Sequence, residues 1–220
     1  MKSLSPLNKR RLSNFVKNKR GLYSFWIFFV LFLISLFADF IANEKPLLIK
    51  YENVFYYPIL QSYSETAFGG DFETEADYRD PFVKNLINSS GWMIMPIIPY
   101  KYNTIIRDIN SPAPSPPSTK NWLGTDDQAR DVISRLIYGF RISILFGFTL
   151  TFFSMIIGVS AGAIQGYFGG KTDLFFQRFM EIWSAIPTLY ILIILASVIQ
   201  PNFWWLLIIL LLFSWMGYVG

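Results

Sequence analysis

The chain has 220 residues, of which 53% are apolar, 19% aromatic and 15% charged, with a formal net charge of +4. A soluble domain carries about a quarter charged residues, so this balance excludes an ordinary water-facing surface and favours lipid. There is no Cys and no His, which excludes disulfides, thiol nucleophiles, His metal sites and triads with an imidazole base. Seven of the nineteen Lys and Arg residues lie within the first twenty positions, which indicates a basic arm rather than nucleic-acid binding.

Residues 1–21 are predicted to be a basic cytoplasmic arm that leads into a first membrane span, 22–41. The arm has no acid, and its bases are Lys2, Lys9, Arg10, Arg11, Lys17, Lys19 and Arg20. Twenty helical residues cover about 30 Å, the thickness of bilayer hydrocarbon. The apolar run is too long for a signal peptide and lacks a cleavage site. Because Lys and Arg beside a span stay in the cytoplasm, we expect the N-terminus inside and Asp39 outside.

Residues 42–121 are polar and are expected to form an external segment. Its acids cluster at Asp71, Glu73, Glu75, Asp77 and Asp80. Ser111 to Ser118 contains four prolines, which cannot continue a helix or pair inside a sheet. The stretch 111–118 is therefore predicted to be an extended linker.

An external amphipathic helix is predicted over 122–142. Thr125 to Gln128 fits a capping box, apolar residues follow at helical spacing, and Asp131 and Arg135 are spaced as an i,i+4 pair on the polar side. We expect this helix to lie on the outer membrane surface. Arg141 has no acid within four positions, so it either reaches lipid headgroups or lines a polar mouth.

The second span is predicted over 143–166. Within it a small residue recurs every four positions, at Ser154, Gly158, Gly162 and Gly166. Such a stripe lets another helix approach closely. Gly158 to Gly162 also matches the GxSxG nucleophile elbow, but that motif needs a strand-to-helix turn and a His, so we interpret the match as a coincidence.

The remaining chain predicts two further spans, over 179–199 and 203–219. Glycines 166, 169 and 170 predict a cytoplasmic turn, after which Asp173 is a candidate N-cap. Pro187 should kink the third span. Pro201 and Asn202 predict an external turn, and Trp204 and Trp205 suit the membrane interface.

The spans hold no cluster of charges, so ion-coupled transport is not supported. Helix capping or ion pairing most simply explains the charges at the edges of the spans, which are Lys171, Asp173, Arg178 and Glu181.

Three stretches resemble the membrane subunits of dipeptide and oligopeptide ABC importers. Asn18 to Gly21 is similar to the basic RNK segment of the family's second, C-type permease subunit. Trp122 to Ser143 resembles LGTDxxGRDxxSRxxxGxRxS. The third stretch is similar to GYxGGxxDxxxxRxxExxxxxP and includes Gly169, Gly170, Asp173, Arg178, Glu181 and Pro187. The long external insert is most similar to the branch associated with microcin C and peptide uptake.

One position departs from the family pattern. Ala129 stands where that pattern has Gly. Because Ala favours helix more than Gly does, the change is not expected to disrupt the helix predicted there.

The resemblance implies an all-α inner-membrane protein with four spans, in which 143–220 is the incomplete start of a type-1 ABC permease bundle. It implies four kinds of partner: a second homologous permease, two cytoplasmic ATPases, a periplasmic peptide-binding protein and the lipid bilayer. ATP would be bound by the ATPases, and no cofactor or metal by this chain. A cytoplasmic coupling loop, the EAA motif, follows the fourth span in such permeases. We therefore expect a chain truncated before this loop, able to insert but not to couple ATP hydrolysis to transport.

The expected function is alternating-access transport of peptides or peptide-like compounds, without enzyme chemistry. Candidates for the translocation path or its outer mouth are Asp126, Arg130, Asp131, Arg135 and Arg141. The alternative is a non-transporting membrane anchor or assembly protein whose external segment binds a partner. Copurification with a nucleotide-binding subunit distinguishes the two.

Overall fold

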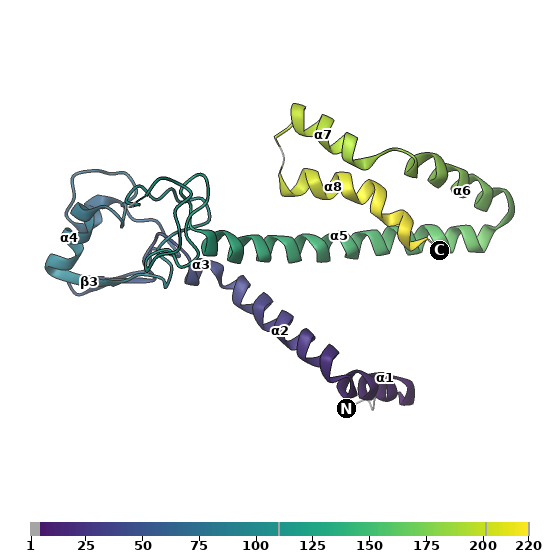
Figure 1. Ribbon diagram of the computed structural model, residues 1–220, viewed down its shortest axis with the longest axis horizontal. Helices are drawn as coiled ribbons and strands as arrows, with labels where there is room; N and C mark the ends of the chain where they lie inside the picture. Colours follow the sequence, from purple (N-terminus) through teal and green to yellow (C-terminus); the bar gives the residue numbers. More distant parts are fainter. Residues whose placement is uncertain (1–4, 110, 201, 220) are drawn as a thin grey trace. The chain divides into compact units, whose positions relative to one another are not determined.

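The structure is a computed structural model that describes residues 5–109, 111–200 and 202–219 (Figure 1). Lys2 of the basic arm, Pro201 of the predicted external turn and Gly220 lie outside the described residues. The chain divides into two compact units, residues 1–141 and 142–220.

The first unit begins with two consecutive helices, α1 (Pro6–Lys17) and α2 (Lys19–Leu36). Asn18 separates them, and its side-chain oxygen accepts the Gly21 backbone N–H at 3.2 Å. Such a bond caps the start of a helix. α2 is long and apolar enough to cross a membrane.

The first predicted span, 22–41, is corrected at both ends. α2 begins at Lys19 and ends at Leu36, and a separate short helix, α3 (Ala38–Ile41), follows. The Ser35 hydroxyl donates to the Phe32 carbonyl at 2.7 Å. A side-chain bond of this kind competes with the helical backbone ladder and favours a bend.

The segment predicted to be external contains a three-stranded sheet, so the expectation of an all-α protein is wrong there. Central strand β1 (Leu48–Tyr51) pairs antiparallel with β2 (Val54–Tyr56) and β3 (Gly91–Ile94). β-branched and aromatic residues fit such a pleated surface. Between β1 and β2, Glu52 and Asn53 take positive φ angles of 45° and 67°, as a two-residue hairpin turn requires.

One face of this sheet packs on an aromatic core. Phe68, at the end of the 3-10 helix η1 (Glu65–Phe68), is completely buried. The rings of Tyr51, Tyr56, Tyr63 and Tyr78 surround it with centroids 5.1–6.4 Å away. Helix α4 (Pro81–Ser90) completes the core with its buried residues Val83 and Ile87. This segment therefore has a hydrophobic core of its own.

The proline-rich stretch 111–118 is free of helix and strand, as predicted, but it is not an unattached linker. Ser115 N donates to the Thr125 hydroxyl at 2.9 Å, and Thr125 N donates back to the Ser115 carbonyl at 3.0 Å. Two reciprocal bonds fix the stretch against the loop that follows it.

The helix predicted over 122–142 and the span predicted over 143–166 are a single helix, α5 (Val132–Phe168), of 37 residues. At 1.5 Å per residue it is about 55 Å long, well beyond the hydrocarbon thickness of about 30 Å. A helix of that length is long enough to cross a bilayer and to extend beyond its hydrocarbon layer.

The predicted helix start near Thr125 is wrong, because residues 122–131 form a loop. Within it Ala129 takes a left-handed conformation with φ 58°. Glycine adopts that region without strain, whereas a Cβ costs about 1–2 kcal/mol. The Gly of the family pattern therefore marks a left-handed loop position rather than a helical one.

The second unit continues with α6 (Gly170–Ser184), α7 (Thr188–Val198) and α8 (Phe203–Ser214), followed by the 3-10 helix η2 (Trp215–Tyr218). α6 and α7 are bent by 61° across their break. The bend lies where Pro187 was expected to produce one, because Pro lacks the N–H that a continuous helix needs there. The third predicted span is thus a broken pair of helices.

The unusual backbone at Ala129 gives a test of the loop. Ala129→Val should destabilise the external domain by about 1 kcal/mol or more, because a β-branched residue resists positive φ. Ala129→Gly should be tolerated, since relief of strain offsets the lost buried methyl group. Thermal unfolding of the detergent-solubilised chain, followed by near-ultraviolet circular dichroism, measures both. A clear loss in Ala129→Gly with none in Ala129→Val would restore the helical interpretation.

Candidate functional site

Asp131 stabilises the start of α5. It precedes the first helical residue, and its Oδ1 accepts the Ser134 backbone N–H at 2.8 Å. Asn121 donates its side-chain N–H to the other carboxylate oxygen at 2.9 Å. With 1% of its surface exposed, Asp131 is a buried N-cap rather than half of the predicted surface pair with Arg135. Its carboxylate is held by residues of the preceding loop and of α5, and Asp131 also lies in the lining of a cavity of about 370 Å³.

Asp126, Arg130 and Arg135 form an ion cluster in the loop before α5. Arg130 donates to Asp126 Oδ2 through Nε at 2.8 Å and Nη2 at 2.7 Å, and Arg135 pairs with the same oxygen. The backbone N–H groups of Gln128 and Arg130 donate to Oδ1, each at 2.9 Å. Three of the five predicted outer-mouth residues therefore meet around one carboxylate.

These partners change the acidity of Asp126. Burial by itself raises its pKa, but the hydrogen bonds from Arg130 and from the two backbone N–H groups outweigh that effect and lower the pKa to about 2. The carboxylate is therefore ionised at neutral pH and holds the loop through charge-assisted hydrogen bonds.

Arg141, the fifth outer-mouth candidate, pairs with Asp39 across 102 residues of sequence. Arg141 Nη1 lies 2.9 Å from Asp39 Oδ2. The Tyr138 hydroxyl donates to Asp39 Oδ1 at 2.7 Å and also lies 2.9 Å from the Ala42 carbonyl. The Arg141 guanidinium sits 4.9 Å from the centre of the Tyr138 ring. This contact joins α3 to α5.

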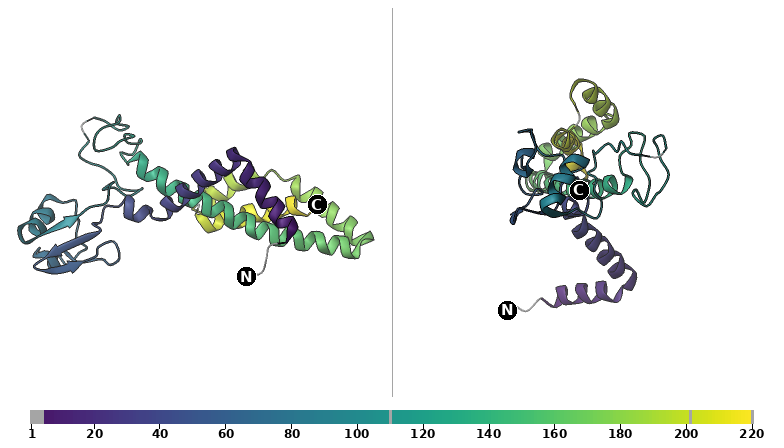
Figure 2. Two further views of the ribbon diagram at one scale, coloured as in Figure 1. Left: turned by 90° about the horizontal axis from the view of Figure 1, so that it is seen from below. Right: turned by 90° about the vertical axis from the view of Figure 1, so that its left-hand side faces the viewer.

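Three of the four residues in the small-residue stripe of α5 face the end of α8 or the residues that follow it. In the left view of Figure 2 the yellow ribbon of this C-terminal segment runs alongside the green ribbon of α5. The hydroxyls of Ser154 and Ser214 are 2.5 Å apart. A methyl group at Gly158 or Gly162 would overlap the backbone carbonyl of Trp215 or Val219. A methyl group at Gly166 would meet nothing within 4 Å, so that position allows no conclusion about packing.

The predicted cytoplasmic turn contains a glycine pair with positive φ. Gly169 and Gly170 have φ angles of 57° and 53°, and Gly169 is the N-cap of α6. The N-cap predicted at Asp173 is therefore wrong, because the glycine pair starts the helix four residues earlier. Asp173 instead accepts from the Gln177 side chain at 3.1 Å. Arg178 and Glu181 form an exposed pair at 2.6 Å.

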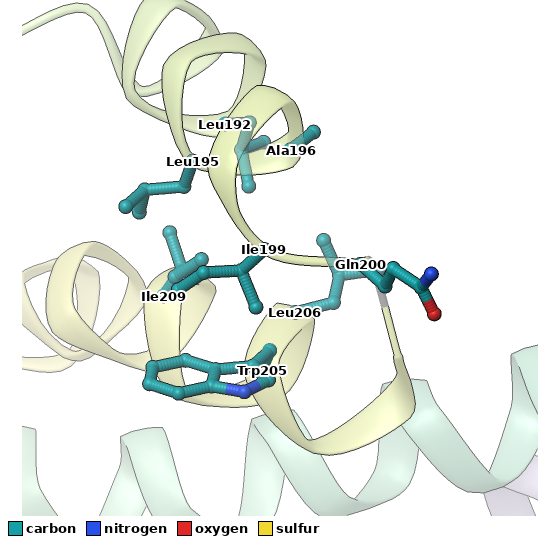
Figure 3. Close-up of a pocket in the computed structure, with 8 residues that line it drawn as sticks. All are labelled: Leu192, Leu195, Ala196, Ile199, Gln200, Trp205, Leu206 and Ile209. Carbon is teal, nitrogen blue, oxygen red and sulfur yellow. The ribbon is translucent and has the colours of Figure 1, made fainter.

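Helices α7 and α8 enclose an apolar groove of about 150 Å³ (Figure 3). Its walls are leucine, isoleucine and alanine side chains with Trp205 on one side, and the amide of Gln200 points away at the rim. A surface made almost wholly of hydrocarbon suits lipid or helix packing. It offers a polar solute nothing to bind.

Two family descriptions match the sequence. "Binding-protein-dependent transport system inner membrane component" matches residues 154–220, and "N-terminal TM domain of oligopeptide transport permease C" matches residues 6–62. Both describe membrane components of transport systems rather than enzymes. The chain is similar, over these two stretches, to inner-membrane components of binding-protein-dependent transport systems.

Individual relatives agree with this family. The chain is 52% identical over all of its 220 residues to the inner membrane ABC transporter permease protein YejE of Escherichia coli strain K12. It is 50% identical over 98% of its length to the peptidoglycan transport system permease protein YejE of Agrobacterium fabrum. The oligopeptide transport system permease protein OppC of Haemophilus influenzae is 36% identical over 62% of the chain and 42% of that relative. The chain spans 64% and 63% of the lengths of the two YejE proteins.

Sequence reasoning missed the residues that join distant segments. The sequence predicts only that Asp39 lies on the outer side of the first span, and it assigns no contact to Tyr138. Ser134 is a fixed position of the motif that Trp122 to Ser143 resembles, but no contact was predicted for it, and no prediction was made for Asn121. Neither periodicity nor motif spacing can detect a contact across about a hundred residues, and a lone acid beside a span was the one available signal.

The low pKa of Asp126 predicts a pH dependence. Ionised Asp126 contributes stability above its unfolded pKa of about 4, and the contribution is lost as pH falls through about 2. Asp126→Asn should therefore destabilise the external domain by about 2 kcal/mol at pH 7. The difference from the unsubstituted chain should shrink between about pH 4 and pH 2.

Thermal unfolding across this pH range measures the effect. Asp127→Asn is the matched control, because Asp127 is the exposed neighbour of Asp126 and should give little change at any pH. A destabilisation by Asp126→Asn that stays constant down to pH 2 would contradict the assignment.

Proposed function

We propose that this chain acts as the second, C-type permease subunit of an ABC importer that carries peptides or peptide-like compounds across the inner membrane. The observation that carries the proposal is the match along the whole chain to an inner membrane ABC transporter permease protein. The printed names of relatives, which include dipeptide, oligopeptide and peptidoglycan transport systems, support peptide-like cargo. Transport would proceed by alternating access and without covalent chemistry.

The proposed topology has four spans. Two helices, α2 and α5, are long and apolar enough to cross a membrane, and the bent pair α6 and α7 counts as a third span if taken together. We assign the fourth to Phe203–Tyr218, a shorter apolar helix. The basic residues of α1 support a cytoplasmic N-terminus through the positive-inside rule. The sheet-containing segment would then face outward.

The proposed partners follow from the family. A second permease subunit would complete the path, two cytoplasmic ATPases would bind ATP, and an extracytoplasmic binding protein would deliver cargo. This chain is proposed to bind no nucleotide or other cofactor. Its external domain, which has a core of its own, stands on the side where the binding protein would dock.

Copurification tests the assignment against the membrane-anchor alternative. The tagged chain, expressed in cells with its neighbouring transport genes, should retain an ATPase subunit and a second permease after detergent extraction. The same purification of an unrelated tagged inner-membrane protein, from cells grown in the same way, controls for non-specific retention of these subunits. An abundant, correctly inserted chain that retains neither subunit would favour the anchor.

The pairing of Arg141 with Asp39 gives a second test. Arg141→Leu should lower uptake of a labelled tripeptide by cells that carry the partner subunits, without lowering membrane insertion, because Asp39 loses its counter-charge. The double exchange Asp39→Arg with Arg141→Asp should restore much of the uptake if the pair acts by closing the external domain. If Arg141 binds cargo in the path, the exchange should leave uptake as low as in Arg141→Leu.

A further inference from the structure

The external domain contains a large charged cleft that no predicted site residue lines. It has a volume of about 990 Å³ and lies between the start of α4 and the segment 99–108. Its charged lining includes Arg79, Lys84 and Arg107 together with Glu44, Asp77 and Asp80. Tyr100 contributes a buried aromatic wall. A volume of this size is typical of sites for small organic ligands.

In the described part of the chain, none of the three cations of the cleft forms an ion pair with a carboxylate, although the charge of Arg79 helps to lower the pKa of Asp108. Six ion pairs occur among the residues that the structure describes, and none of them includes Arg79, Lys84 or Arg107. The Arg79 guanidinium lies 5.4 Å from the centre of the Tyr100 ring. A cation over an aromatic face is held in place without being neutralised, so Arg79 is oriented and keeps its charge for a ligand.

The acids are held by uncharged donors. Asp77 Oδ1 accepts the Arg79 backbone N–H at 2.9 Å, Asp80 Oδ1 accepts that of Phe82 at 2.8 Å, and Glu44 Oε2 accepts the Thr104 hydroxyl at 2.7 Å. Each of these bonds uses one oxygen and leaves the negative charge uncompensated. A fourth acid of the lining, Asp108, differs because it pairs with Lys120 at 3.3 Å.

The balance of charge decides what kind of ligand fits. Among the residues described, three cations without an ion pair and three carboxylates without an ion pair line the same cleft, so a simple anion is repelled by the acids and a simple cation by the bases. A ligand with a carboxylate at one end and an ammonium at the other satisfies both sets. A second cavity of about 370 Å³ shares Lys84, Pro99, Tyr100 and Asp108 with the cleft, so the site continues and suits an extended ligand.

We propose that this cleft is a binding site for short peptides with free termini. The peptide carboxylate would bind Arg79, Lys84 and Arg107, and its ammonium group would bind Glu44, Asp77 and Asp80. The lining of the cleft indicates a ligand that carries both a positive and a negative charge. That this ligand is a peptide, rather than another zwitterion, rests on the proposed function. The site gives the permease its own contact with cargo outside the membrane.

Binding to the complete chain in nanodiscs of neutral lipid tests the site without ATPases or a binding protein. Isothermal titration is carried out with trialanine, its C-terminal amide and its N-acetyl form. The variants are Arg79→Gln and Arg107→Gln, singly and together. Lys50→Gln is the matched control, because Lys50 is also an unpaired cation, over the Phe55 ring at 5.7 Å, outside the cleft.

Trialanine should bind the unsubstituted chain and Lys50→Gln equally. Each Arg→Gln variant should bind it about tenfold more weakly or worse, the loss expected for a charge-assisted hydrogen bond. Amidation should weaken binding to the unsubstituted chain similarly and have no further effect on the double variant. Acetylation should weaken binding to all of these chains alike, since it removes the charge that the acids bind.

The inference is overturned if free, amidated and acetylated peptides bind equally, if Lys50→Gln loses as much affinity as Arg79→Gln, or if trialanine does not bind at millimolar concentration. Circular dichroism of each variant establishes that it is folded. Because titration needs neither ATP nor partners, loss of the site and loss of transport are separate results. A chain that binds peptide but retains no ATPase subunit would support the peptide site and contradict the proposed importer function.

Discussion

The ion pair between Asp39 and Arg141 joins the two ends of the segment that contains the sheet. About a hundred residues separate the two side chains, so their contact closes a long loop, at an entropic cost that rises slowly with loop length. The Tyr138 hydroxyl and the Ala42 carbonyl add hydrogen bonds at the same point. A small apolar cluster surrounds them, in which Ala38, Ala42 and Tyr138 pack with Ile98 and Ile106. Both ends of the domain are therefore held together.

The loop before α5 extends this constraint into the domain. Asp131 caps the helix while its second oxygen accepts a hydrogen bond from Asn121, and the Ser134 hydroxyl donates to the Tyr100 carbonyl at 2.9 Å. Tyr100 is in turn the aromatic wall of the charged cleft. A continuous set of hydrogen bonds thus runs from the start of a membrane-crossing helix to the proposed peptide site. A peptide that changes the position of Tyr100 would act on the N-terminal turn of α5.

In the apolar helices of the second unit, close packing of small residues rather than ion pairing holds α5 against the C-terminal helices. Gly158 and Gly162 admit the backbone of η2 and the residue after it, and Ser154 meets Ser214. Trp183 of α6 stacks on Phe213 and donates its indole N–H to the Leu212 carbonyl at 3.0 Å. Packing of this kind suits lipid, where apolar side chains gain nothing by leaving their surroundings and close backbone approach supplies the attraction.

The sequence by itself determined that the chain contains long apolar helices suited to a membrane and that its motifs resemble those of ABC permease subunits, because length, hydropathy and contiguous motifs are local properties. The bend at Pro187 and the small-residue stripe were predictable for the same reason. Tertiary structure alone decided that Asp131 is a buried cap, that Arg141 pairs with Asp39, and that α5 begins at Val132. It also decided that Ala129 lies in a left-handed loop. Each of these features depends on contacts with residues that are distant in the sequence, and the spacing of residues along the chain does not show which distant residues come into contact.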